Sequence, residues 1–167
     1  QEIIATTTVN GNKFVFEGVA DSAMLSMLYI KDTPQFGLLI LENGNITLNF
    51  KSEEVIKATI ASGTENNETL TEVLAVCDTI SEENIKAESA KWFAKHNNDI
   101  IGVLLLTSPL YRALDDETRL ATIEGLGNYL KSLDIVKEEF NSLKGKIATA
   151  VGKPFVDFEV SMIMNPF

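Results

Sequence analysis

The chain has 167 residues, 45% of them hydrophobic, which suits a soluble globular chain with one domain or two small ones. Its 24 acidic and 14 basic residues give a net charge of −10, which repels phosphate backbones, so we expect no nucleic-acid binding. The longest apolar run, residues 100–106, is far shorter than the roughly 20 residues of a membrane-spanning helix, so we expect no membrane span. The single cysteine excludes a Cys-x-x-Cys redox centre within these residues.

Two Asn-Gly pairs, Asn10-Gly11 and Asn43-Gly44, lie between strand-like runs. Asn-Gly accepts the positive φ angles of tight hairpin turns, so the sequence predicts two hairpins. After the first, Phe14 and Phe16 share one face of a predicted strand. After the second, apolar and polar residues alternate over 46–51, as in a half-buried strand.

Between the two turns, residues 24–30 and 36–41 are more continuously apolar, which is typical of buried central strands. A further strand is predicted at about 55–60. The first 62 residues therefore predict an antiparallel β unit of five to six strands.

From Thr64 onward the apolar spacing becomes helical and predicts about five helices. One of them is a continuous helix through Gly125 and Gly127 to Leu130, and the last carries its apolar stripe over residues 136–147. The predicted helix starts are Thr64, Ser81, Asn98 or Asp99, a restart at Ser108-Pro109, and Asp115 or Asp116.

Strands followed by helices, without alternation, predict an α+β fold. We expect an antiparallel β domain at 1–62, a helical region at 63–151, and a tail at 152–167 that is either the start of a thioredoxin-like domain or a packing segment with strand character. Whether the helical region packs on the sheet or stands beside it is open at this point.

Five segments in order carry a resemblance to a known family. They are residues 11–18 (GNKFVFEG), 41–48 (LENGNITL), 62–67 (SGTENN), 98–102 (NDIIG) and 151–158 (VGKPFVDF). The chain resembles the domain of unknown function 4369, which precedes thioredoxin-like domains of the peroxiredoxin type in exported proteins of the Bacteroidetes group. The resemblance implies an exported protein of the cell envelope or periplasm, with lipoprotein attachment as one route.

Two functions follow as alternatives. The first is a non-enzymatic exported module that binds or positions a partner. The second is the N-terminal fragment of a thiol-disulfide oxidoreductase that lacks its catalytic thioredoxin domain, because the 151–158 run resembles the first strand of such a domain while no dithiol motif is present. A start at Gln1 is typical of a processed product whose signal segment has been removed, or of a chain whose leader was trimmed.

Cys77 and His96 are the first residues to weigh for chemistry. Cys77 falls on the apolar stripe of its predicted helix, where a thiol behaves as a small hydrophobic group with a raised pKa. His96, the only histidine, is predicted in the last turn of a helix, where it complements the helix dipole. One histidine and one buried cysteine do not supply the ligands of a zinc site.

The acidic clusters are Asp115-Asp116-Glu117, Glu53-Glu54 and Glu138-Glu139. The first is predicted to cap a helix and lacks the spaced oxygen ligands of a calcium loop. Gly125-Leu126-Gly127 lies inside a helical pattern, without the lysine of a phosphate-binding loop. We therefore predict no catalytic, cofactor-binding or metal-binding residue, no cofactor, and no enzymatic activity.

The tail contains four large apolar residues, Met162, Ile163, Met164 and Phe167. Left exposed, they would favour aggregation. One prediction is a homodimer, formed by the tail pairing with a sheet edge or through a sheet edge itself. The alternative is that the last residues are disordered. The partner is otherwise unknown.

Overall fold

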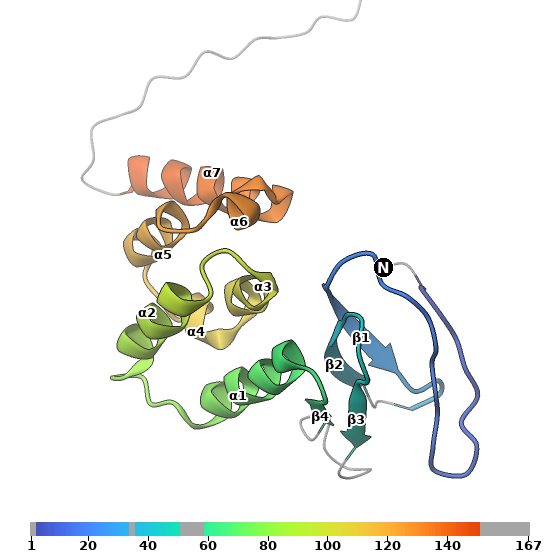
Figure 1. Ribbon diagram of the computed structural model, residues 1–167. Helices are drawn as coiled ribbons and strands as arrows, with labels where there is room; N and C mark the ends of the chain where they lie inside the picture. The colour runs from blue at the N-terminus through green and yellow to red at the C-terminus, as the bar shows by residue number, and fades with distance from the viewer. Residues whose placement is uncertain (1–2, 34–35, 51–58, 151–167) are drawn as a thin grey trace, which may run out of the picture. The chain divides into compact units, whose positions relative to one another are not determined.

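The computed structural model describes residues 3–33, 36–50 and 59–150 (Figure 1). The fold is α+β, as predicted, with four strands followed by seven helices in these residues. The predicted five to six strands and five helices were therefore not exact. The chain forms two compact units, residues 1–74 and 75–167. The predictions for the tail at 152–167 and for Glu53-Glu54 concern residues outside the described ranges.

Strands precede all helices in chain order. The elements are β1 (Met24–Tyr29), β2 (Phe36–Leu41), β3 (Thr47–Phe50), β4 (Thr59–Ser62), α1 (Glu65–Thr79), α2 (Ile85–Lys95), α3 (Ile100–Thr107), α4 (Pro109–Arg112), α5 (Asp116–Glu124), α6 (Asn128–Ser132) and α7 (Asp134–Ala148). The strand predicted at 55–60 falls mostly outside the described residues, and its last two positions coincide with the start of β4.

The described strands form two antiparallel pairs, β1 with β2 and β3 with β4 (Figure 1). In the first pair Leu25 lies opposite Ile40. The prediction that both apolar runs are central strands is not met among the described residues, where β1 and β2 pair only with each other. Met24 and Met27 of β1 are 38% and 41% exposed. Apolar content predicts that a strand forms, but it does not specify how many neighbours the strand acquires.

The first Asn-Gly pair makes a tight turn. Gly11 has a φ of 64°, and the Asn10 N–H donates to the Lys13 carbonyl at 2.8 Å. The pairing stops at this isolated bridge, because residues 3–9 and 14–19 contain no strand. Phe14 and Phe16 nevertheless stay together, with ring centres 6.0 Å apart. We call residues 3–19 the N-terminal arm; it is the dark blue loop beside the strands in Figure 1.

The second Asn-Gly pair does not form the predicted hairpin, since β2 and β3 belong to different strand pairs. The Asn43 side chain instead binds the backbone of Ala20. Its Nδ2 donates to the Ala20 carbonyl at 2.8 Å, and its Oδ1 accepts from the Ala20 N–H at 3.0 Å. The residue that was predicted to shape a turn therefore fastens the chain just beyond the N-terminal arm.

A second asparagine binds strand backbone in the same way. Asn67, in the first turn of α1 and fully buried, accepts from the Ile40 N–H at 2.9 Å and donates to the Ile40 carbonyl at 2.8 Å. Its Nδ2 also donates to Thr64 Oγ1 at 2.8 Å. The side-chain amide thus supplies the donor and acceptor that a neighbouring strand would offer to Ile40.

Most predicted helix starts agree with the structure of the second unit. Asp99 and Asp115 are N-caps whose carboxylates accept from Gly102 N–H and Thr118 N–H, and Ser108 precedes Pro109 at the first position of α4. The prediction that Ser81 caps a helix is wrong, because residues 81–84 form a separate turn and α2 begins at Ile85.

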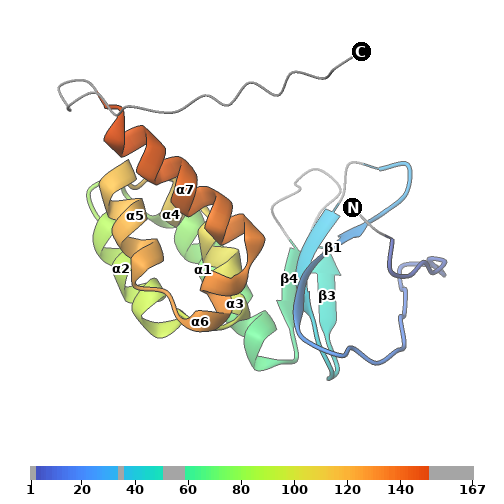
Figure 2. The same cartoon turned by 90° about the horizontal axis from the view of Figure 1, so that it is seen from above.

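The predicted continuous helix through Gly125 and Gly127 is instead two helices, α5 and α6. The Gly127 N–H donates to the Asn97 carbonyl at 2.7 Å, and the Asn98 side chain accepts from the Tyr129 N–H at 2.8 Å. These bonds to Asn97 and Asn98 take the place of the backbone bonds of a continuous helix, which glycine favours less than other residues do. The break lets α7 pack along both α5 and α6 (Figure 2).

Candidate functional site

Three helices of the second unit meet in a group of polar side chains. Arg119 of α5 donates to Glu139 of α7, and the Tyr111 hydroxyl of α4 donates to the same carboxylate at 3.3 Å. The Arg119 guanidinium lies over the Tyr111 ring, 4.9 Å from its centre. Asp116 accepts a further bond from Arg119 at 3.5 Å. The group therefore ties α4, α5 and α7 together through one shared carboxylate.

Tyr111 is 2% exposed, and burial raises the pKa of its hydroxyl to about 12, with Arg119 opposing the rise and Glu139 adding to it. A phenol with this pKa is neutral near pH 7 and acts as a donor, not as a base. The Glu139 carboxylate is occupied by Arg119 and Tyr111. The arrangement is thus suited to holding helices in place, and it offers no free base for proton transfer near neutral pH.

We expect this tyrosine to make the protein sensitive to alkali. The folded chain holds the Tyr111 proton more tightly than the unfolded chain does, so the stabilisation is present below pH 10 and is lost as the pH rises through about 12. The free energy of unfolding falls by at most about 2–3 kcal/mol over this pH range. In urea unfolding, the free energy of unfolding should fall less between about pH 9 and about pH 11 in Tyr111→Phe than in the wild type. Tyr129→Phe, at an exposed tyrosine, is the control; equal losses in all three proteins would contradict the prediction.

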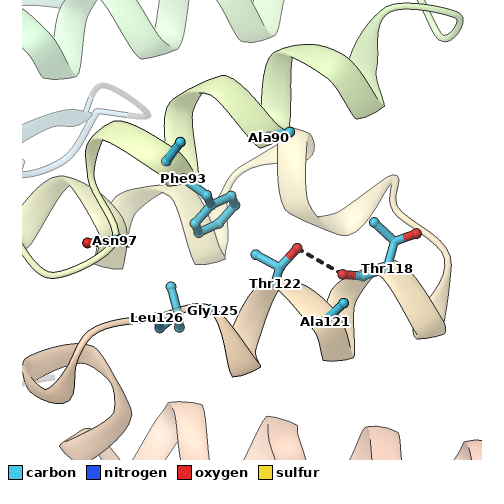
Figure 3. A pocket seen from close by; sticks show the side chains of 9 residues that line it. Ala90, Phe93, Asn97, Thr118, Ala121, Thr122, Gly125 and Leu126 are labelled. Carbon is cyan, nitrogen blue, oxygen red and sulfur yellow. Dashed lines mark hydrogen bonds between the residues drawn. The ribbon is translucent and has the colours of Figure 1, made fainter.

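A shallow groove of about 340 Å³ lies between α2 and α5 (Figure 3). Small side chains line it, including Ala90, Ala121 and Thr122, and the Phe93 ring points into the space between the two helices. The Thr122 hydroxyl donates to the Thr118 carbonyl at 2.8 Å. No lining residue is charged, so the groove can take an apolar group but presents no acid, base or strong nucleophile.

His96 lies at the C-cap of α2, at the end of the helix where the sequence placed it. Its Nδ1 is 2.8 Å from Asp99 Oδ2, and Asp99 uses its other oxygen to cap α3. The imidazole is stacked on Trp92 and is largely buried. Among the described residues its Nε2 has no hydrogen-bond partner, and they contain no cluster of three metal-ligating side chains. The geometry fits a histidine that joins two helix ends.

Cys77 lies on α1 and is half-buried. Burial raises the pKa of its thiol, while hydrogen bonds with the Leu110 backbone and the Ser108 hydroxyl oppose the rise. A raised pKa lowers the fraction of thiolate, which is the nucleophilic form. The position agrees with the predicted apolar stripe.

The acidic residues serve different purposes. Asp115 caps α5, and its hydrogen bonds from Thr118 hold the pKa of its carboxyl below the usual value. Asp116 accepts from Arg119, whereas Glu117 is exposed in the first turn. Of the pair Glu138-Glu139, only Glu139 enters the polar group described above.

Sequence reasoning missed the polar group because its members are far apart in the chain. Tyr111 and Glu139 are separated by 28 residues, and Arg119 carried no motif. It also missed Asn67, although the residue lies in the 62–67 run. A local signal was present, because Asn67 follows Thr64 by three residues and donates to its hydroxyl, but this signal does not point to Ile40.

The N-terminal arm and β1 expose the most apolar surface in the part of the chain that the structure describes. Nine of the eleven exposed large apolar side chains there lie between residues 3 and 29. Six belong to the arm: Ile3, Ile4, Val9, Val15, Phe16 and Val19. Exposed apolar side chains gathered in one segment are typical of interaction surfaces.

The fold and these sites thus define an α+β chain whose first unit joins an exposed apolar arm to two strand pairs. Residues 1–70 match the model of a family described as a domain of unknown function, DUF4369. The match covers the arm, the four described strands and the start of α1, and most of the helical unit lies outside it. Searches of curated proteins and of solved structures found no match. Among the described residues, no helix has both the length and the apolar character needed to cross a bilayer.

Proposed function

We propose that the chain is a non-enzymatic, exported module that binds or positions another protein of the cell envelope. The N-terminal arm is the proposed binding surface. The observation that carries this proposal is the exposure of the arm's six large apolar side chains, from 44% at Phe16 to 88% at Val19. Side chains of this kind are stabilised when a partner removes them from water, by about 25 cal/mol for each Å² of apolar area.

The backbone of the arm supports the same function. Apart from the Asn10–Lys13 bridge, residues 3–19 do not belong to any strand. Extended backbone of this type can bind another extended segment by strand addition, where main-chain bonds provide affinity and side chains provide specificity. The arm therefore fits a partner with an extended apolar segment.

The non-enzymatic part of the proposal rests on the chemistry of the candidate residues. Cys77 has a raised thiol pKa, Glu139 is occupied, and the uncharged groove between α2 and α5 has no base. The export of the protein is proposed from the family resemblance. Detection of the native protein in the envelope or periplasmic fraction would support it, and recovery in the cytoplasmic fraction alone would contradict it.

Site-specific photo-crosslinking tests the binding surface. A photoreactive residue replaces Val15 or Val19 in the arm, or Asn141 on the exposed side of α7 as the matched control. In envelope fractions we expect a discrete crosslinked product from the arm positions and none from the control. Ile4→Asp in the same chain should remove the product. Identical products from the arm and the control, or none from either, would refute the proposal.

The alternative, an N-terminal fragment of a thiol-disulfide oxidoreductase, stays a prediction. Its supporting run, residues 151–158, lies outside the described residues.

A further inference from the structure

The two Asn-Gly pairs, Asn10-Gly11 and Asn43-Gly44, have the same local chemistry but different surroundings. In such a pair the backbone nitrogen of the glycine can attack the Cγ atom of the preceding asparagine, because glycine has no Cβ to obstruct the approach. Both pairs belong to an Asn-Gly-Asn run, and both asparagines are exposed to solvent. A difference in their reactivity in the folded chain would therefore come mainly from the fold.

The first pair is open to this reaction. A Cβ added at Gly11 would meet nothing within 4 Å, so the space beside its backbone is free. The bridge to Lys13 uses the backbone N–H and carbonyl of Asn10 and does not involve its side chain. Within the described part of the chain, neither the Asn10 side-chain amide nor the Gly11 N–H has a hydrogen-bond partner. The two reacting groups can therefore meet without breaking a hydrogen bond.

The second pair is held away from the same reaction. The Asn43 amide makes two hydrogen bonds with the Ala20 backbone, at 2.8 Å through Nδ2 and at 3.0 Å through Oδ1. A Cβ at Gly44 would lie 2.7 Å from Thr64 Cγ2, so the chain is closely packed there. Attack on the Asn43 Cγ requires both hydrogen bonds to break first, which slows the reaction.

We propose that Asn10 is a site of spontaneous deamidation in the folded protein, and that Asn43 is protected from it. The Gly11 nitrogen forms a bond to Asn10 Cγ, and the bond from Cγ to the side-chain nitrogen breaks. The side-chain nitrogen leaves as ammonia with the proton that Gly11 gives up. One water molecule then opens the cyclic imide at either of its carbonyl carbons, and the products are aspartate and isoaspartate. No oxidant or reductant takes part.

The reaction changes the charge of the N-terminal arm. Lys13 and Glu17 are the charged residues of the arm, so it is formally neutral, and one new carboxylate gives it a net charge of −1. The carboxylate lies next to Val9, which is exposed, and a charge is costly to remove from water. Deamidation should therefore weaken the binding of an apolar partner. This consequence rests on the proposed function, whereas the reaction itself does not.

Peptide mapping of the purified full chain tests the proposal. The protein is incubated in mildly alkaline buffer and cleaved after lysine, which puts Asn10 in the peptide ending at Lys13 and Asn43 in the peptide ending at Lys51. Mass spectrometry with fragmentation follows the conversion of each amide to a carboxylate. We expect Asn10 to react at least about tenfold faster than Asn43, because the hydrogen bonds of the Asn43 amide must break first. Equal rates, or a faster Asn43, would overturn the proposal.

Two controls separate the fold from the local sequence. In concentrated urea both pairs lose their surroundings, so the two rates should become similar; the same ratio in urea as in the folded protein would refute the protection assigned to Asn43. Asn10→Gln is the matched variant, because its longer side chain would have to close a larger ring.

This variant should lose the main acidic species that ion exchange separates from the aged wild type, while Asn43 reacts as before. An equal yield of that species from Asn10→Gln would contradict the proposal. The test uses pure protein, so its result is distinct from that of the envelope crosslinking.

Discussion

Replacing Asn67 by alanine is expected to destabilise the first unit by about 3–5 kcal/mol. The substitution removes three hydrogen bonds of a fully buried side chain. It also leaves the N–H and carbonyl of Ile40, itself 0% exposed, without the side-chain partners they have now. An unsatisfied buried polar group costs about 1–3 kcal/mol, so two such groups account for most of the effect.

The measurement should report on the first unit alone, because the only tryptophan, Trp92, lies in the second. Amide hydrogen exchange of β2 does this. We expect a loss of protection across residues 36–41 in Asn67→Ala. Asn66→Ala is the matched control; its amide bonds the Glu42 carboxylate from a partly buried position, so its loss should cost roughly 1 kcal/mol. Equal protection of β2 in the two variants would disprove the role given to Asn67.

Gly102→Ala is expected to have the second largest effect on stability. It should destabilise the protein, although helix propensity by itself favours alanine. Alanine favours a helix over glycine by about 1 kcal/mol. At position 102, however, a Cβ would overlap the His96 carbonyl oxygen and a methyl group of the buried Leu130. Backbone cannot move aside as a flexible side chain can, so we expect a net loss of about 1–3 kcal/mol or more.

Gly145→Ala is the matched control for this substitution, because it also lies within a helix and a Cβ there meets nothing within 4 Å. It should stabilise the protein by roughly 0.5–1 kcal/mol. Urea unfolding followed by Trp92 fluorescence measures both variants, since both glycines belong to the same unit as the tryptophan. If Gly102→Ala were as stable as Gly145→Ala, the close packing of α3 on the loop after α2 would be refuted.

The local parts of the fold were predictable from the sequence. Residues 36–41 form β2 with the predicted limits, and Asp99, Asp115 and Pro109 start helices as predicted. Each of these features depends on residues within one or two turns of one another. The chain order of strands and helices, and with it the α+β class, follows from the same local patterns.

The features that sequence reasoning missed depend on contacts between distant residues. Asn43 and Asn67 bind backbone groups 23 and 27 residues away, so neither a turn rule nor a helix rule predicts their partners. The break between α5 and α6 likewise involves Asn98, whose bond to Tyr129 spans 31 residues. The candidate site shows the same limit, because Arg119 and Glu139 meet only after α5 and α7 have packed.

The amide of Asn67 has a consequence for strand addition at β2. A strand that joined β2 at Ile40 from the side of α1 would need the Ile40 N–H and carbonyl, and both are already bonded to the buried Asn67 side chain. A competing peptide would therefore have to displace the first turn of α1 before it could pair at this position.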